Sequence, residues 1–228
     1  MEKKQFDLCL KIIRRFHDAG ILNDLILIGS WCAYFYQDYF AGTPYADRLN
    51  IKTRDIDFLI DNPSRIKRSV NIPELLADLG FVTIFKGSKG YIKLEHPDLL
   101  LEFLVPEKGR TSDKPHPLPQ LGLNATPLRF LNFLSANTLK AKMDQFQITV
   151  PHPANFALHK LIIFQRRTRE EKAEKDRRIA IEILHALIKK GDVPTVKRVF
   201  NSIPQKWQKK ILKGLDDLTD REIIDILK

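Results

Sequence analysis

The chain has few cysteines and no long hydrophobic run. Cys9 and Cys32 are the two cysteines among 228 residues, too few for a disulfide framework, so we expect both to be buried free thiols. No apolar stretch approaches the ~20 residues that cross a bilayer, and the N-terminus lacks the hydrophobic segment of a secretory signal. These absences argue against a disulfide-stabilised secreted protein and against a membrane protein. We expect a cytoplasmic protein with no membrane partner.

The length and the charge distribution suggest two domains of different character. A chain of 228 residues can form one large or two modest domains. The net charge is +10. Residues 151–228 contain 18 Lys or Arg against 11 Asp or Glu, whereas residues 1–150 contain 20 against 17. Such a basic region can attract RNA, DNA or a triphosphate, or form solvated helices of mixed charge.

The order of the apolar patterns predicts a mixed sheet followed by helices. We expect strands at 25–28, 55–60, 81–85, 91–94 and 99–105, and helices at 3–19 and 73–79. The proline-rich stretch 114–119 is expected to be a surface loop. Beyond residue 151 the pattern is helical. We therefore expect an α+β protein, with a mixed β-sheet flanked by helices over residues 1–150 and a helical C-terminal domain over residues 151–228.

A short apolar strand ends in Gly29-Ser30, directly before a helix-compatible stretch that begins at Trp31. A glycine lets a ligand approach the backbone closely. A serine in the first turn of a helix offers its hydroxyl group and nearby N–H groups to an anion. Gly29 and Ser30 are therefore predicted to form a phosphate-binding turn.

Two aspartates, Asp55 and Asp57, begin the next apolar strand. Side chains two residues apart on a strand share a face, so both carboxylates should point to one place while Ile56 and Phe58 pack on the other face. Two like charges this close call for a cation between them. Oxygen ligands of this kind suit Mg²⁺ or Mn²⁺ rather than zinc.

A third carboxylate, Glu102, lies in the middle of the otherwise apolar run 99–105. An unpaired charge would be costly there. Glu102 must therefore find a partner, reach the solvent side of its strand, or join a metal site. The two preceding motifs favour the metal site.

This series of strand, Gly-Ser, helix, Asp-x-Asp and a third carboxylate resembles the nucleotidyltransferase superfamily, which has the DNA polymerase β-like fold. The resemblance implies that Gly29 and Ser30 hold nucleotide phosphates. It also implies that Asp55, Asp57 and Glu102 hold metal ions, with Glu102 also a base for the acceptor hydroxyl. The chain departs from the family pattern in the long stretch before Asp-x-Asp and in a third acid that is Glu instead of the commoner Asp.

The first resemblance covers about residues 20–105. Downstream, residues 128–134 and 151–161 resemble a bacterial nucleotidyltransferase-like family of largely unknown substrate. This second resemblance implies that Lys160 contacts the triphosphate, with His159 as a lesser helper.

The motifs and the resemblance together predict a metal-dependent nucleotidyltransferase. It would move a nucleoside monophosphate from an NTP, such as ATP, to a hydroxyl or phosphate acceptor and release pyrophosphate. The acceptor stays open among RNA, including tRNA, a protein and a small molecule.

Other interpretations of the same motifs remain open. A catalytically inactive nucleotide- or RNA-binding module of the same fold, such as a toxin–antitoxin component, would keep the motifs without transfer. A phosphatase of the haloacid-dehalogenase type is disfavoured because the apolar strand continues after Asp57. Finally, the two aspartates can form a solvated strand edge paired with Arg54.

Overall fold

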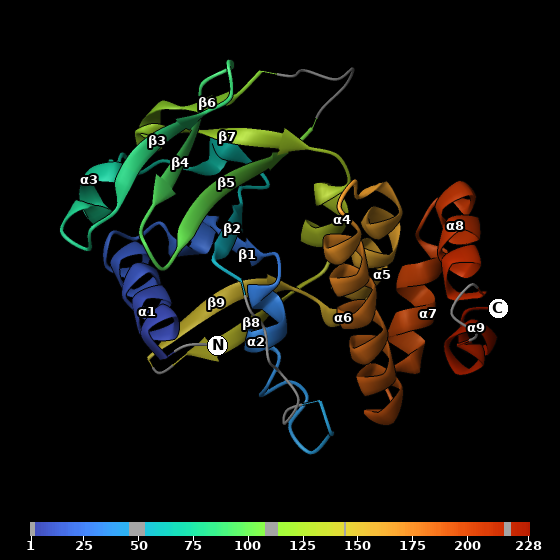
Figure 1. The fold of residues 1–228 in the computed structure, drawn as a ribbon. Coiled ribbons are helices and arrows are strands. Elements are labelled where there is room, and N and C mark those ends of the chain that lie inside the picture. The colour runs from blue at the N-terminus through green and yellow to red at the C-terminus, as the bar shows by residue number, and fades with distance from the viewer. Residues whose placement is uncertain (1–2, 46–52, 108–113, 144, 217–219) are drawn as a thin grey trace. The chain divides into compact units, whose positions relative to one another are not determined.

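The computed structural model describes residues 3–45, 53–107, 114–143, 145–216 and 220–228. The chain divides into two units. The first unit comprises Met1–Phe35 and Asn50–Pro151, and the second comprises Tyr36–Leu49 and His152–Lys228. The sheet belongs to the first unit and the C-terminal helices to the second (Figure 1).

Nine strands of the described residues form the mixed sheet of the first unit. They are β1 (Ile26–Ile28), β2 (Asp55–Leu59), β3 (Val82–Lys86), β4 (Tyr91–Glu95), β5 (Leu100–Pro106), β6 (His116–Leu118), β7 (Leu123–Leu128), β8 (Thr138–Met143) and β9 (Phe146–Pro151). The strand order is β3-β4-β5-β2-β1-β9-β8, with β7 paired to β5 and β6 paired to β7. Because β2 runs antiparallel to β1 and parallel to β5, the predicted mixed sheet is confirmed.

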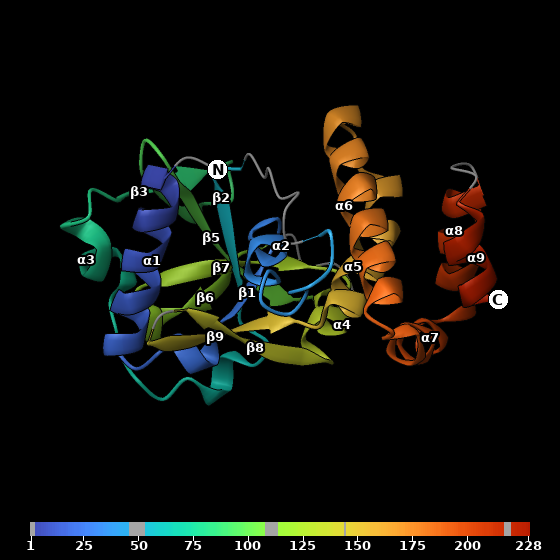
Figure 2. The same ribbon diagram turned by 90° about the horizontal axis from the view of Figure 1, so that it is seen from below.

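Helix α1 (Lys3–Asp18) covers one face of the central strands (Figures 1 and 2). Its apolar residues recur at helical spacing, and Phe16 on this stripe is fully buried. The Phe16 ring lies 5.3 Å, edge to face, from the ring of Phe58 in β2. Phe58 in turn stacks on Phe103 of β5 at 5.8 Å. These aromatic contacts form the core between α1 and the sheet.

The described residues of the first unit also form three shorter α-helices: α2 (Trp31–Phe35), α3 (Ile72–Ala77) and α4 (Leu131–Ser135). Asn71 caps the N-terminus of α3 by accepting a hydrogen bond from the backbone N–H of Glu74. The helix therefore begins one residue before the proline at which the sequence pattern placed its start.

The prediction of a surface loop over residues 114–119 was wrong for its central part. Residues His116–Leu118 form β6, which pairs antiparallel with β7. Leu118 is fully buried, so its side chain fixes the short strand in the core despite the surrounding prolines. A three-residue strand leaves too few alternating positions to be recognised from the sequence.

The second unit contains five helices among its described residues. They are α5 (Pro153–Ile163), α6 (Glu170–Lys189), α7 (Val193–Asn201), α8 (Gln205–Asp216) and α9 (Arg221–Leu227). The segment that begins at Tyr36 packs with them: the Tyr36 ring lies 5.7 Å from that of Phe156, and the Tyr39 hydroxyl donates to Oδ2 of Asp192 at 2.8 Å. No helix in the described ranges is long and apolar enough to span a membrane.

Replacing Phe58 by alanine tests the aromatic core. We expect Phe58→Ala to lower the free energy of unfolding by about 3–5 kcal/mol, because it removes a large buried ring and leaves a cavity. Urea denaturation measures this loss. The control is Phe85→Ala in β3, where the side chain is 70% exposed and the expected change is within about 0.5 kcal/mol. Equal losses in the two variants would contradict the assigned core.

Candidate functional site

The Gly29 turn and the side chain of Asp57 lie in direct contact in the first unit. Gly29 has φ +75°, a left-handed conformation that glycine adopts without steric cost. A Cβ atom on Gly29 would lie 2.4 Å from Oδ2 of Asp57. The carboxylate of Asp57 therefore lies directly against the backbone of the turn, and the structure brings the two sequence motifs together.

The strand register gathers the three predicted acids on one face of the sheet. Asp57 is the partner of Ile28 in β1 and of Glu102 in β5. Asp55 precedes Asp57 by two residues and shares its face. All three acids are partly exposed, whereas Phe58, on the opposite face, is fully buried. One face of β2 therefore holds the hydrophobic core and the other holds carboxylates.

Ser30 lies between the Gly29 turn and the start of α2 at Trp31. The backbone N–H of Cys32 donates to the carbonyl oxygen of Gly29 at 3.2 Å, which closes the turn. Because α2 has only five residues, few peptide dipoles add up along it and the helix dipole is weak. The missing side chain at Gly29 leaves room for the carboxylate of Asp57 to lie against the backbone of the turn.

Glu102 is held by two side chains from neighbouring strands. Nζ of Lys93 in β4 donates to its Oε2 at 2.6 Å, and Oγ1 of Thr126 in β7 donates to its Oε1 at 3.3 Å. The sequence analysis missed both partners. Lys93 lies in a predicted strand, but its proximity to Glu102 depends on the pairing of β4 with β5, which the sequence pattern did not specify.

Two alternative interpretations of the Asp-x-Asp motif can be compared with the structure. Arg54 donates from Nη2 to the carbonyl oxygen of His96 at 3.0 Å, and within the described residues it forms no ion pair with Asp55 or Asp57. Strand β2 continues past Asp57 to Leu59, unlike the strand of a haloacid-dehalogenase-type phosphatase, which precedes its carboxylates. Neither alternative matches the observed geometry.

The donor set fits a hard divalent cation held by two carboxylates. Asp55 and Asp57 offer only oxygen ligands, and Mg²⁺ commonly takes one or two protein carboxylates while keeping several waters. Among the residues that the structure describes, no group of three or more His, Cys, Asp or Glu side chains is arranged to hold a metal ion. This is consistent with the engagement of Glu102 by Lys93 and Thr126.

Lys160, the predicted triphosphate contact, lies in α5 of the second unit and is 5% exposed. Its Nζ donates to Oδ1 of Asp176 at 2.5 Å. Nε of Arg167 donates to the other oxygen of Asp176 at 2.9 Å. Burial, with a smaller effect of the Lys160 charge, lowers the pKa of the adjacent His159 to about 3, so that imidazole is neutral at physiological pH. In this structure Lys160 acts as the counter-ion of a buried aspartate.

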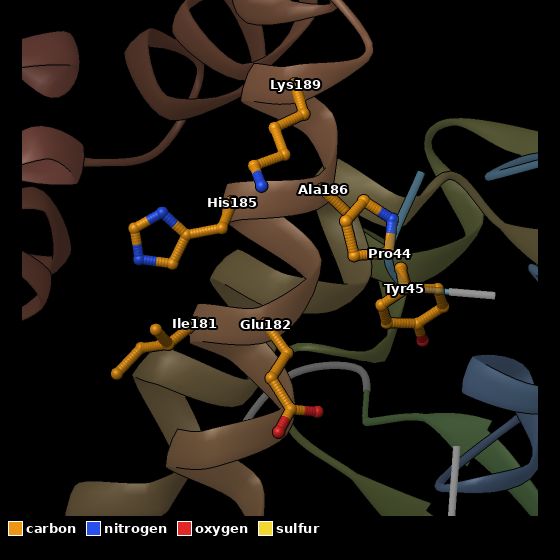
Figure 3. Close-up of a pocket in the computed structure, with 7 residues that line it drawn as sticks. All are labelled: Pro44, Tyr45, Ile181, Glu182, His185, Ala186 and Lys189. Atoms are coloured by element: carbon orange, nitrogen blue, oxygen red, sulfur yellow. The ribbon is translucent and has the colours of Figure 1, made fainter. Parts of the chain in front are cut away.

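Cavities lie elsewhere in the described parts of the two units. One, of about 280 Å³, lies in the second unit, where Pro44 and Tyr45 face α6 (Figure 3). Another, of about 380 Å³, lies in the first unit, where its lining includes Asp61, just after β2, and Glu107, just after β5. Neither of these cavities is lined by any of the six predicted site residues.

His185 in α6 lines the 280 Å³ cavity (Figure 3) and contacts two acids at the start of α9. Its Nε2 lies 2.9 Å from Oδ2 of Asp220, and its Nδ1 lies 3.0 Å from Oε2 of Glu222. Asp220 also caps α9 by accepting from the backbone N–H of Ile223. These contacts give His185 a structural role within the second unit.

A mixed sheet in which a glycine turn faces an Asp-x-Asp pair on the adjacent strand is the arrangement expected of nucleotidyltransferases. The chain belongs to this family of transferases: a family model described as Nucleotidyltransferase matches residues 8–204. A search of the curated proteins finds no match.

The following two are among the solved structures that resemble the chain. The crystal structure of an antigenic nucleotidyltransferase-like protein from Paracoccidioides brasiliensis matches 96% of this chain and 91% of its own, with a TM-score of 0.51 and 16% sequence identity. The crystal structure of ANT(2")-Ia in complex with adenylyl-2"-tobramycin matches 95% of this chain and 100% of its own, with a TM-score of 0.48 and 13% identity. The first likeness supports the fold alone.

Replacing Gly29 by alanine tests the close approach of Asp57. We expect Gly29→Ala to lower the free energy of unfolding by about 2 kcal/mol or more, because the strain of a positive φ adds to the clash with Oδ2 of Asp57. The control, Gly87→Ala, has φ +71° and no atom within 4 Å of the added Cβ. It isolates the conformational cost, about 1–2 kcal/mol. Urea denaturation compares the two, and a smaller or equal loss at Gly29 would refute the contact.

Asp176 makes stability depend on pH. Burial raises the pKa of Asp176, but Lys160 and Arg167 outweigh burial and hold that pKa below its usual value. The ionised form therefore stabilises the folded protein above the unfolded-state pKa of about 3.9, and this contribution is lost as the pH falls through the lower folded-state pKa. At pH 7 we expect Asp176→Asn to cost about 3–5 kcal/mol, because Lys160 stays buried without its carboxylate.

The pH series that checks this uses urea denaturation from pH 7 down to pH 3. The stability difference between the wild type and Asp176→Asn should narrow below about pH 4. Glu171→Gln, at an exposed position of the same helix, is the control and should show no such narrowing. A difference that stays constant with pH would mean that folding does not lower the pKa of Asp176.

Proposed function

We propose that the protein is a metal-dependent nucleotidyltransferase that moves a nucleoside monophosphate from an NTP to a hydroxyl or phosphate oxygen of an acceptor. The observation that carries this proposal is the contact between the Gly29 turn and Asp57, where an added Cβ would lie 2.4 Å from the carboxylate oxygen. A phosphate that approaches the turn therefore also approaches the aspartates. Family membership supports the reaction class.

In this proposal the backbone of Gly29 and the hydroxyl of Ser30 bind the phosphates of the nucleotide. Asp55 and Asp57 hold Mg²⁺ or Mn²⁺, which when bound neutralises charge on the triphosphate and orients it. The acceptor oxygen forms a bond to the α-phosphorus as the bond to the pyrophosphate oxygen breaks. Glu102, the neighbour of Asp57 in β5, is our candidate to accept the proton that an acceptor hydroxyl loses.

The charge of the C-terminal region favours an acidic acceptor such as RNA, including tRNA. Residues 151–228 carry 18 Lys or Arg against 11 Asp or Glu, and basic residues bind the phosphate backbone independently of sequence. A protein and a small hydroxylated molecule are the other two classes of acceptor. Acceptor fractions of these three kinds therefore belong in one experiment.

The test incubates the protein with each of the four NTPs, labelled at the α-phosphate, with Mg²⁺ or Mn²⁺ and with RNA, protein or small-molecule fractions of a cell extract. We expect label to appear in an acceptor. We expect Asp55→Asn and Asp57→Asn to reduce the rate by about a hundredfold or more, equivalent to a few kcal/mol of transition-state stabilisation. The control, Asp61→Asn, changes a carboxylate just beyond the end of the same strand and should keep the activity.

Equilibrium dialysis with the same nucleotides separates the enzyme from a catalytically inactive module. Nucleotide binding that depends on Asp57 but leads to no transfer would identify a binding module of the same fold. A wild-type protein that neither binds nor transfers any nucleotide would refute the proposal.

A further inference from the structure

The ion pair between Lys93 and Glu102 lies largely out of water. The lysine side chain is 11% exposed and the glutamate side chain 21%. At 2.6 Å between Nζ and Oε2, the two charges are in direct contact. Charges in such surroundings interact more strongly than a pair on the open surface, because less solvent screens them. Glu102 therefore already has a cation beside it.

The partners of Glu102 lie on the opposite edge of β5 from the aspartates. Strand β5 pairs with β2 along one edge and with β4 and β7 along the other. Lys93 belongs to β4 and Thr126 to β7, and each binds one of the two carboxylate oxygens. The carboxylate is thus drawn toward β4 and β7 and away from Asp57, although Asp57 is its register partner.

Lys93 neutralises the charge of Glu102, so this carboxylate does not need a metal ion as its counter-ion. Mg²⁺ needs only one or two protein carboxylates, because waters and phosphate oxygens complete its octahedral shell.

We propose that Lys93 is a positioning residue that keeps Glu102 out of the ligand set of the divalent metal, so that Asp55 and Asp57 are the carboxylates that bind it. This inference rests on the proposed function, since it concerns the same site. It removes Glu102 from the metal ligands implied by the family resemblance and leaves it as the candidate base of the proposed function. Lys93 acts through Glu102 and does not itself touch the metal.

The test measures the binding of Mn²⁺ alone to the full chain, from the electron paramagnetic resonance signal of the free ion. We expect Glu102→Gln to change the Kd by no more than about twofold, because that carboxylate is not a ligand. We expect Lys93→Met to tighten binding by about three- to tenfold, because the released Glu102 becomes a third ligand. The gain should vanish when Lys93→Met is combined with Glu102→Gln.

Two control variants separate positioning from simple charge or folding effects. Lys86→Met removes the same charge from an exposed position of the same sheet and should leave the Kd unchanged. Lys93→Arg retains the cation and should bind Mn²⁺ like the wild type. Thermal unfolding of each variant shows that the protein is folded under the binding conditions, and Glu102→Gln keeps the test decisive if Lys93→Met does not fold.

The outcomes distinguish this inference from the proposed function. A tenfold or greater loss in Glu102→Gln would show that Glu102 is already a ligand and would overturn the inference. A gain in Lys93→Met that persists without Glu102 would also overturn it, because it would be an effect of net charge. If Asp57→Asn binds Mn²⁺ as tightly as the wild type, the proposed function itself fails, whatever the Lys93 variants do.

Discussion

The packing of Phe58 on Phe103 beneath Phe16 is the constraint on which the candidate site depends. These rings must be buried against α1, and strand side chains alternate between faces. The residues next to them in β2 and β5 must therefore point to the opposite side. Asp57 precedes Phe58, and Glu102 precedes Phe103. The hydrophobic core thus determines which face of the sheet carries the acids.

A second rule holds in both units: charged groups that are withdrawn from water are paired. Glu102 lies against Lys93 in the first unit, and Asp176 lies between Lys160 and Arg167 in the second. The cost of leaving a buried charge unpaired exceeds the modest gain of each pair. For this reason a lysine within an apolar helix, such as Lys160, can equally form a structural ion pair with a buried acid or bind a ligand.

Several features could be predicted from the sequence because they depend on local patterns. The mixed sheet, the C-terminal helices and the nucleotidyltransferase family are confirmed. The shared face of Asp55 and Asp57 follows from alternation along one strand. The pairing of Lys93 with Glu102 and of Lys160 with Asp176 could not be predicted, because each depends on which elements pack together. The short strand at Leu118 was missed because three residues carry too little pattern.

The composition of the second unit has a consequence for protein synthesis. Tyr36 and Tyr39 pack on Phe156, His152 and Asp192, which lie more than a hundred residues further along the chain. At ~5–20 residues per second, these tyrosines emerge from the ribosome roughly 6–30 seconds before their partners. The segment after α2 must remain without those contacts while the sheet of the first unit is made. A ribosome pause before residue 152 would lengthen the exposure of these aromatic side chains to chaperones and proteases.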